Sequence, residues 1–326
     1  MTVTGAGWQR GARARRRRPD LLSPAGMPSA AIVINRTLVR DLGRFRRRCR
    51  AAAAAGGWEP SFLETSVDDR GLGLARGAVA DGAQLVVAAG GDGTVRACAQ
   101  ALAGTRVPLA IVPLGTANLA ARALGLPSGT GRALAAGFGG QERRIDLAVA
   151  ETGGAGALTF AAMAGIGLDA EVVAATPRLL KSRAGWLAYA ASGAAHLAGR
   201  AEHFTVRLDD GQPWARRARC VVVGNAGLLP GGFALLPRAR LDDGVLDVGI
   251  LAPSGPAGWL RVAQRVLTGS GRQDGQLERH QARRVEITAG TDLPREVDGE
   301  VISPGRGLTV TLLRRALTVR VPPPRS

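Results

Sequence analysis

The residues best suited to chemistry gather in one loop, within the stretch QLVVAAGGDGTVRACAQALAG. Gly90, Gly91 and Gly93 let the backbone turn sharply and bring free N–H groups close to phosphate oxygens. The helix expected after them adds the positive end of its dipole. Asp92 offers oxygens to a magnesium ion, and Thr94 can cap the helix while donating to a phosphate. The loop therefore predicts a binding site for a nucleotide triphosphate with magnesium.

The same residues also suit a tight strand-to-helix turn that binds nothing, and this alternative stays open for the loop taken alone. Two common phosphate motifs are absent from the sequence, the Walker A loop with its Gly-Lys-Ser/Thr and the dinucleotide fingerprint G-x-G-x-x-G. The single lysine of the chain, Lys181, is far from the loop in sequence. Cationic help to bound phosphates must therefore come from arginine or from a metal ion.

Composition indicates a globular protein with a sizeable core. The chain has 326 residues, of which 46% are apolar, and its length favours two domains. It contains no run of about 18 apolar residues, and its first residues lack the apolar centre of a secretory signal, so a cytoplasmic location is the default expectation. Cys49, Cys98 and Cys220 are isolated, which argues against disulfide scaffolds and zinc sites.

The formal charge of +17 implies an anionic partner. Nucleic acid, anionic lipid headgroups and nucleotide phosphates all satisfy it. Aromatic residues make up only 4% of the chain and do not alternate with basic ones, which argues against single-stranded nucleic acid. An anionic membrane surface is the favoured partner, with genome bias as the alternative explanation for most individual arginines.

Composition and the spacing of apolar residues divide the chain into four parts. Residues 1–26 are rich in Gly, Ala, Pro and Arg and predict a disordered basic tail. Residues 27–146 alternate strand and helix patterns, which predicts an α/β domain whose parallel sheet is covered on both faces. Residues 147–306 show short apolar runs separated by glycines, which predicts an antiparallel β-sandwich with one helix at 184–198. Residues 307–326 can form a hairpin or return to the first domain.

The α/β pattern also places the expected ligand site. A helix is expected over 38–55, with an apolar stripe facing the core and a basic outer face that also suits anionic lipid. The strands expected around it are Ala30–Asn35, Ser61–Thr65, Leu85–Ala89 and Leu109–Val112. Ligands of such sheets bind beyond the carboxyl ends of the strands. The residues at those ends are Asn35, Thr65, Gly90 and Gly115.

Further motifs follow the first loop in a fixed order. PLGTANLAAR predicts a second strand-loop-helix junction, in which Gly115 turns the chain and Thr116 and Asn118 offer polar groups to the same crevice. GIGLDA, VVVGN, GGFALLPRARLDDGVLDV and VDGE come next. The ordered set GGDGT, P-x-G-T-x-N, GG-x-x-x-x-P-x-A-x-x-D-D-G-x-L-D and DGE resembles the diacylglycerol kinase catalytic family, which includes bacterial lipid kinases and the sphingosine and ceramide kinases. The resemblance covers residues 30–301.

This resemblance implies ATP-dependent phosphorylation of the hydroxyl of diacylglycerol or a similar lipid, giving phosphatidic acid. The site would lie in a cleft between a Rossmann-like nucleotide-binding domain and the β-sandwich. Glu300 matches the general base, and Asp92 matches a ligand of the catalytic magnesium ion. Asp243, with the backbone carbonyls of Arg240 and Val245, matches a structural magnesium site. The implied nucleotide contacts are Asn35, Arg36, Thr37, Leu38, Val39, Thr65, Gly90, Gly91, Asp92, Gly93, Thr94, Thr116 and Asn118.

The resemblance also implies a cytoplasmic protein that associates peripherally with the inner face of the membrane, acts in phospholipid metabolism and binds no specific nucleic acid. A homodimer is compatible with it. Alternative acceptors are a sphingoid base, ceramide, phosphatidylglycerol or NAD. A catalytically silent lipid-binding regulatory protein with the same fold is the alternative from another class.

Three departures from the family pattern bear on these alternatives. The first strand leads into INRTLVRD, where Asn-Pro with a later Ser-Gly is usual, so Arg36 replaces backbone contacts with charge. Leu119 stands where an acid commonly follows the motif's asparagine. Arg96 and Ala97 stand where Asn-Glu is common. The acid, the base and the glycines are retained, which predicts an active enzyme.

Overall fold

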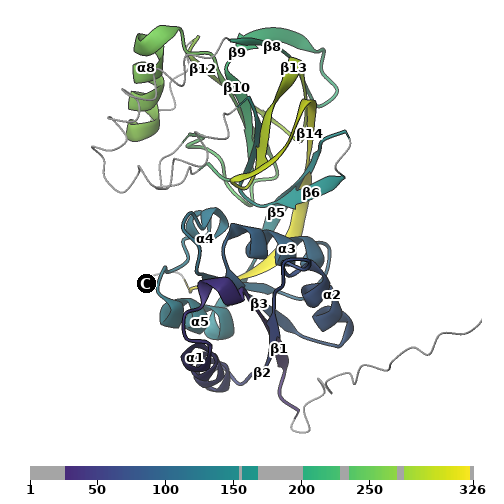
Figure 1. Ribbon diagram of the computed structural model, residues 1–326, viewed down its shortest axis with the longest axis vertical. Coiled ribbons are helices and arrows are strands. Elements are labelled where there is room, and N and C mark those ends of the chain that lie inside the picture. Colours follow the sequence, from purple (N-terminus) through teal and green to yellow (C-terminus); the bar gives the residue numbers. More distant parts are fainter. Residues whose placement is uncertain (1–25, 154–155, 168–200, 228–234, 270–274, 324–326) are drawn as a thin grey trace, which may run out of the picture.

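The computed structural model describes residues 26–153, 156–167, 201–227, 235–269 and 275–323. These residues form an α/β part, lower in Figure 1, and an antiparallel β part above it. The tail before residue 26, the helix expected at 184–198 and Asp169 lie outside the described residues. The predicted fold class, a parallel α/β region followed by an antiparallel β domain, is confirmed.

The α/β part is built on four parallel strands in the order β2-β1-β3-β4. Their bounds are β1 Ser29–Ile34, β2 Glu59–Glu64, β3 Leu85–Gly90 and β4 Leu109–Pro113. Every residue of β3 and β4 is buried. Both strands lie inside a sheet that is covered on its two faces, which is why their sequences are continuous apolar runs.

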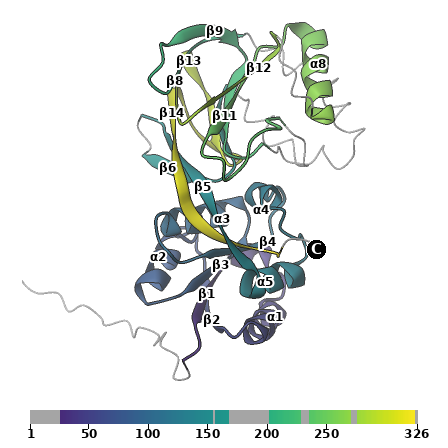
Figure 2. The ribbon, with the colours of Figure 1, turned by 180° about the vertical axis from the view of Figure 1, so that it is seen from behind.

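Helices cover both faces of this sheet. Helices α1 and α5 pack against each other on one face, and α2 and α3 pack on the other, as Figures 1 and 2 show from opposite sides. The helix bounds are η1 Arg36–Leu38, α1 Leu42–Ala55, α2 Leu72–Ala80, α3 Asp92–Leu102, α4 Leu119–Ala123 and α5 Thr130–Gly139. The predicted apolar stripe of α1 does face the core, since Phe45 and Cys49 are buried.

The antiparallel part follows the order β12-β11-β10-β7-β13-β14. Strand β8 adds to β13, β9 to β8, and β6 to β5. The bounds are β5 Gln141–Glu151, β6 Ala157–Phe160, β7 Met163–Ile166, β8 Glu202–Leu208, β9 Trp214–Ala218, β10 Cys220–Gly224, β11 Leu246–Leu251, β12 Leu277–Ala282, β13 Arg284–Val297 and β14 Glu300–Val321. Helix α8, Gly255–Thr268, contributes buried Val262 and Val266 to a core cluster with Cys220 and Val222 of β10.

Strands β5 and β14 connect the two parts. Residues 309–313 of β14 pair with 147–151 of β5, and residues 317–321 pair with 141–145. These two halves of β14 therefore form one strand rather than a hairpin with each other, and Val319 pairs with Leu109 of β4.

A β-bulge interrupts β14 between its two halves, opposite Asp146. Asp146 is 1% exposed, and its carboxylate accepts the N–H of Arg315 at 2.6 Å and that of Gly244 at 2.8 Å. Arg315 has a φ of 47°, a conformation that L side chains seldom adopt. Asp146 thus holds the bulge at the point where β14 passes from one part to the other.

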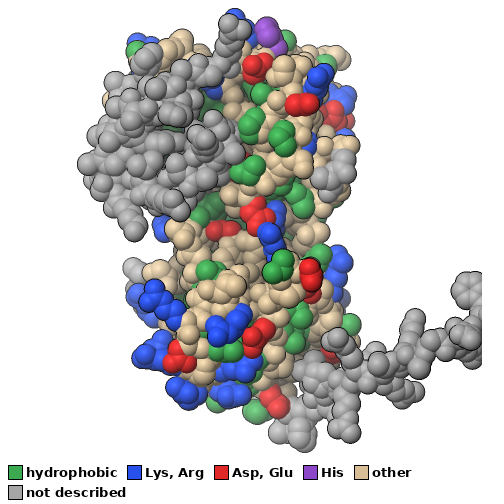
Figure 3. Space-filling model, in the orientation of Figure 1, with side chains coloured by type: hydrophobic (Ala, Val, Ile, Leu, Met, Phe, Trp, Pro, Cys, Tyr) green, Lys and Arg blue, Asp and Glu red, His purple; other side chains and the backbone are tan. Residues whose placement is uncertain are grey.

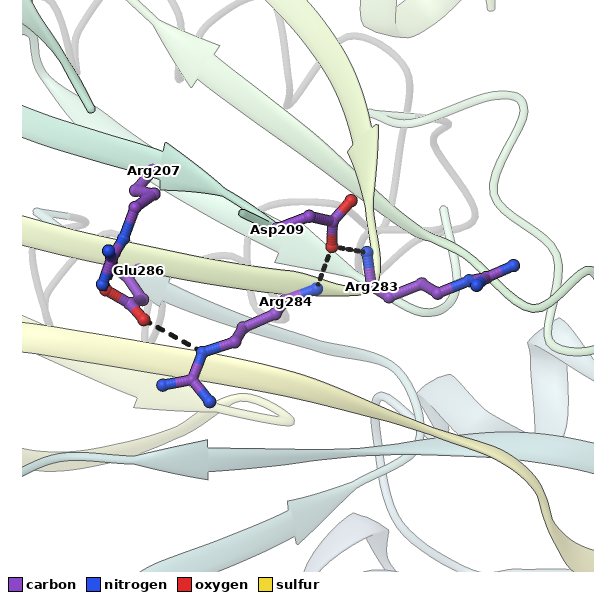
Figure 4. A network of polar contacts seen from close by, with 5 residues as sticks. All are labelled: Arg207, Asp209, Arg283, Arg284 and Glu286. Carbon is purple, nitrogen blue, oxygen red and sulfur yellow. Dashed lines mark hydrogen bonds and ion pairs between the residues drawn. The ribbon is translucent and has the colours of Figure 1, made fainter. Parts of the chain in front are cut away.

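A polar network fixes the outer edge of the antiparallel part (Figure 4). Asp209 accepts the backbone N–H groups of Arg283 and Arg284, both at 2.8 Å. Glu286 binds the side chains of Arg207 and Arg284, and the hydrogen bond from Arg207 lowers the pKa of that carboxyl. Exposed ion pairs add little stability. The backbone hydrogen bonds to Asp209 are therefore the contacts of this network that fix the end of β8 against the start of β13.

The Asp146→Ala substitution is expected to lower the free energy of unfolding by about 2–5 kcal/mol, because it leaves two buried N–H groups without their acceptor. Urea unfolding measures this, with Glu142→Ala as the control, since Glu142 lies on the same strand with its side chain 53% exposed. Equal stability of the two variants would show that Asp146 does not hold the junction.

Candidate active site

The two glycine-rich loops follow β3 and β4 and touch each other. A Cβ on Gly115 would lie 2.7 Å from Cα of Gly91, and a Cβ on Gly90 would lie 2.6 Å from Oγ1 of Thr94. None of Gly90, Gly91, Gly93 and Gly115 has a positive φ. Their backbone conformation is therefore open to other residues, and the space around them is what requires glycine. At Gly91 and Gly115 the two loops pack backbone to backbone, whereas a Cβ on Gly90 would meet the side chain of Thr94 and one on Gly93 that of Glu300.

Asp92 ties the two loops together. Its carboxylate accepts the N–H of Asn118 at 2.8 Å and the N–H of Leu119 at 2.6 Å. Burial raises the pKa of Asp92, and these two backbone bonds oppose that rise. The carboxylate oxygens keep capacity to bind a cation or a water molecule. The predicted metal ligand is thus also the link that places the second loop beside the first.

Thr94 does not cap α3, contrary to the sequence expectation. Gly91 occupies the cap position without a side-chain bond, and Thr94 lies inside the first turn, 4% exposed. Its Oγ1 accepts Nδ2 of Asn35 at 3.4 Å, which joins the loops after β1 and β3. The N–H of Thr94 donates to the carbonyl of Gly91 at 3.1 Å, so the N–H groups that the helix leaves to an anion are those ahead of Thr94.

The other expected nucleotide contacts lie around these loops. Asn35 accepts the N–H and the hydroxyl of Thr37, at 3.1 and 2.7 Å, and so closes the loop after β1. The side chain of Leu38 lies next to Gly91. Arg36 donates to the carbonyl of Val39 at 2.7 Å, so its charge stays at that loop.

In the second loop, Asn118 holds both backbone groups of Gly115. Its own φ is 48°. Thr116 is exposed. Thr65 follows β2 and donates its backbone N–H to Ile34 at 2.9 Å, beside the same edge of the sheet. The structure therefore gathers the predicted contacts at the carboxyl ends of β1, β2, β3 and β4.

Glu300 reaches this edge from the antiparallel part. It is the first residue of β14, and its Oε1 would lie 2.9 Å from a Cβ on Gly93. Oε1 also accepts Nη1 of Arg70 at 2.7 Å, and Oε2 pairs with Nη2 of Arg96. No motif of the sequence points to Arg70, and Arg96 stands out only as a departure from the family pattern. Ion pairs between residues more than 200 positions apart carry no local sequence signal.

The turn before Glu300 is held by two buried acids. Asp298, with a φ of 49°, accepts the N–H groups of Ala161, Ala162 and Met163 at 2.9–3.2 Å. Burial raises its pKa to about 6, although the three backbone bonds oppose the rise. Glu296 accepts the N–H of Gly299, and burial raises its pKa to about 8. These bonds fix the backbone from which Glu300 projects.

The predicted structural metal site lies apart from these loops. Asp243 accepts the N–H of Val245 at 3.3 Å, whereas Arg240 faces Asp242, which also pairs with Arg143 at 2.7 Å. Burial raises the pKa of Asp243, and the charge of Asp146 raises it further. No group of three His, Cys, Asp or Glu side chains suited to a metal occurs among the described residues. The metal role of Asp243 with two carbonyls stays a prediction.

Comparison with known proteins identifies the family. The diacylglycerol kinase catalytic domain model matches residues 30–150, and the YegS C-terminal NAD kinase beta sandwich-like domain model matches residues 162–321. The chain is 34% identical over 274 residues to the probable lipid kinase YegS-like of Pseudomonas fluorescens, covering 83% of this chain and 88% of that protein. It is 35% identical over 279 residues to the probable lipid kinase YegS-like of Pseudomonas aeruginosa, covering 84% and 89%.

A solved structure shares the fold. The crystal structure of a diacylglycerol kinase from Bacillus anthracis superposes with a TM-score of 0.69 at 21% identity, over 91% of this chain and 97% of that one. The chain therefore belongs to the family of diacylglycerol kinases and YegS-like lipid kinases, as the motifs predicted. Members of this family are phosphotransferases that use ATP. No helix in the described ranges has the length and apolarity needed to cross a bilayer.

The Gly115→Ala substitution should separate the two loops, because the new methyl group would overlap Gly91. Overpacking of this kind costs about 1–3 kcal/mol, so we expect ADP affinity to fall about tenfold or more in calorimetric titration. Gly131→Ala is the matched control, since a Cβ there meets nothing within 4 Å. Unchanged ADP affinity in the first variant would mean that loop contact does not shape the site.

Glu296 should make stability fall as the pH rises. Its folded pKa of about 8 exceeds the ordinary 4.5, so folding favours the protonated form. The free energy of unfolding that is lost by keeping Glu296 protonated in the folded state is zero below about pH 4.5. This loss grows by about 1.4 kcal/mol per pH unit until the carboxyl ionises near pH 8. Glu296→Gln removes this loss, so the variant should gain stability over the wild type between pH 5 and about 8. Parallel pH profiles of the two unfolding midpoints would contradict the burial argument.

Proposed function

We propose that the protein transfers the γ-phosphate of MgATP to the hydroxyl of diacylglycerol or a similar lipid, giving phosphatidic acid. Family membership supports the class of reaction. The observation that carries the proposal for this chain is the position of Glu300. Its carboxylate, brought from the antiparallel part, lies over Gly93 at the start of α3, where a phosphate binds best.

Glu300 acts as the general base. It accepts the proton of the lipid hydroxyl while that oxygen forms a bond to the γ-phosphorus. The bond from this phosphorus to the oxygen that bridges to the β-phosphate breaks, and ADP leaves. Glu300 is free to exchange the proton afterwards, because its side chain is 35% exposed.

The two loops bind and align the nucleotide. N–H groups at the start of α3 hold phosphate oxygens, and Thr116 offers an exposed hydroxyl to the same edge. Asn35 and Leu38 border the first loop and contact the nucleotide from the β1 side. Bound MgATP supplies the phosphoryl group together with the metal charge that neutralises it.

The acids present fit magnesium at the first loop. The carboxylate of Asp92 lies in the first loop with acceptor capacity beyond its bonds to Asn118 and Leu119, which suits a direct or water-mediated ligand of the ion. Asp243 lies beside Val245, whose N–H it accepts at 3.3 Å, and the resemblance assigns it to a structural ion together with the backbone carbonyls of Arg240 and Val245. Asp92 is therefore the proposed ligand of the catalytic ion and Asp243 that of a structural one.

A basic surface suits the membrane that holds such a substrate. Arg44, Arg47 and Arg48 of α1 are exposed, and the described residues provide none of them with an ion pair. Figure 3 shows Arg side chains gathered over the lower, α/β part of the molecule. We propose that the protein is cytoplasmic and attaches peripherally to the anionic inner face of the membrane, which brings the acceptor to the site.

The Glu300→Gln substitution tests the proposal. It should lower kcat for transfer of labelled phosphate to diacylglycerol by about 10²- to 10⁴-fold, since the neutral amide cannot take the proton. ADP affinity and the unfolding midpoint should change little. Glu286→Gln is the control, because Glu286 also pairs with two arginines, Arg207 and Arg284, but at the outer edge of the antiparallel part.

Full transfer by Glu300→Gln would remove the base from the mechanism. Transfer by the wild type to a sphingoid base, ceramide, phosphatidylglycerol or NAD in place of diacylglycerol would keep the chemistry and replace the acceptor. Absence of magnesium-dependent transfer to all of these would favour a silent lipid-binding protein.

A further inference from the structure

Arg96 is a partly buried cation with unused hydrogen-bonding capacity. Its side chain is 12% exposed and projects from α3 towards Glu300, with which Nη2 forms an ion pair. Its other terminal nitrogen, Nη1, is buried and has no hydrogen-bond partner in the part of the chain that the structure describes. An unpaired buried donor on a charged group is costly. Such a group is kept most readily where a ligand completes its bonds.

The location of this group identifies the ligand as an anion. The Glu300 carboxylate that Arg96 holds lies over Gly93, in the first turn of α3. The guanidinium and the positive end of the helix therefore act on the same small region. A phosphate bound at this helix end would lie beside the carboxylate and repel it. A guanidinium shared between the two anions removes that repulsion, because its fork can donate to both at once.

Local charge agrees with this assignment. Two arginines, Arg70 and Arg96, face the single carboxylate of Glu300. The Arg70 side chain is 65% exposed, and the loop that carries it is fixed by Asp69, which accepts the N–H groups of Gly71 and Leu74. Exposure to water weakens the field of Arg70. Arg96 is shielded from water, because its side chain is only 12% exposed. Its positive charge therefore acts more strongly on a bound anion than that of Arg70 does.

We propose that Arg96 bridges the base and the transferred phosphate, with Nη2 on Glu300 and Nη1 on an oxygen of the γ-phosphate. In this arrangement Arg96 neutralises charge on the phosphoryl group during transfer and keeps the base next to the acceptor hydroxyl. The inference rests on the proposed function, because it places the γ-phosphate at the start of α3. It adds a catalytic residue that also distinguishes ATP from ADP.

Nucleotide binding tests this without a lipid acceptor. Calorimetric titration with ADP and with a non-hydrolysable ATP analogue, both with magnesium, is compared for the wild type, Arg96→Ala, Arg96→Lys and Arg70→Ala. Arg96→Ala should weaken binding of the ATP analogue by about 10- to 100-fold and that of ADP by less than about threefold, because only the analogue carries the γ-phosphate. Arg96→Lys should bind the ATP analogue more tightly than Arg96→Ala does. Arg70→Ala should lose less affinity for the analogue than Arg96→Ala.

Arg76→Ala is the matched control, since Arg76 is exposed on the neighbouring helix α2. Unfolding midpoints show whether each variant is folded, and Arg96→Lys serves if the alanine variant is not. Equal losses for ADP and the analogue, no loss for either, or a wild type that binds neither nucleotide would overturn the inference.

Lipid phosphorylation is measured on the same proteins. Guanidinium ion added to Arg96→Ala should restore part of its transfer rate, which a purely structural role would not allow. If the wild type phosphorylates no lipid while Arg96→Ala still loses its preference for the ATP analogue, the proposed function fails and the Arg96 assignment stands. If lipid transfer is present and the preference is unchanged in Arg96→Ala, the assignment fails alone.

Discussion

The structure depends on one buried carboxylate at the junction of its two parts. Asp146 holds the bulge of β14 through the N–H of Arg315 and holds the loop at Gly244. On one side of that bulge β14 runs back to Glu300, and on the other it pairs with β4 of the parallel sheet. Because one continuous strand belongs to both parts, its register determines where Glu300 meets the glycine-rich loops.

The site is assembled from contacts that each join two separate segments. Asp92 joins the first loop to the second, and the close approach of Gly91 and Gly115 allows no side chain between them. Asp298 anchors the turn that carries Glu300. Arg96 of the α/β part forms an ion pair with the Glu300 carboxylate of the antiparallel part. These contacts place the loops and Glu300 by bonds within the protein, which suits phosphoryl transfer, where alignment and charge neutralisation supply most of the catalysis.

The fold and the glycine-rich loops could be predicted from the sequence, because both leave a local pattern in it. Apolar runs such as β3 and β4 predict a covered parallel sheet, and glycine-rich loops after them predict the phosphate site. The role of a residue across space could not be predicted in the same way. Thr94 was expected to cap α3 but lies in its first turn, and Arg96 gave no sign that it faces Glu300. Long-range pairs of this kind depend on strand register, which a single sequence does not encode locally.

The central claim is that the residues gathered at the carboxyl ends of the parallel strands transfer phosphate to a lipid hydroxyl. The most direct measurement incubates the wild-type protein with MgATP and vesicles that contain a panel of lipid alcohols, and identifies the products by mass spectrometry. The account predicts phosphatidic acid formed from diacylglycerol, in step with ADP and only when magnesium is present. ATP turnover with no lipid in the panel gaining a phosphate would contradict it.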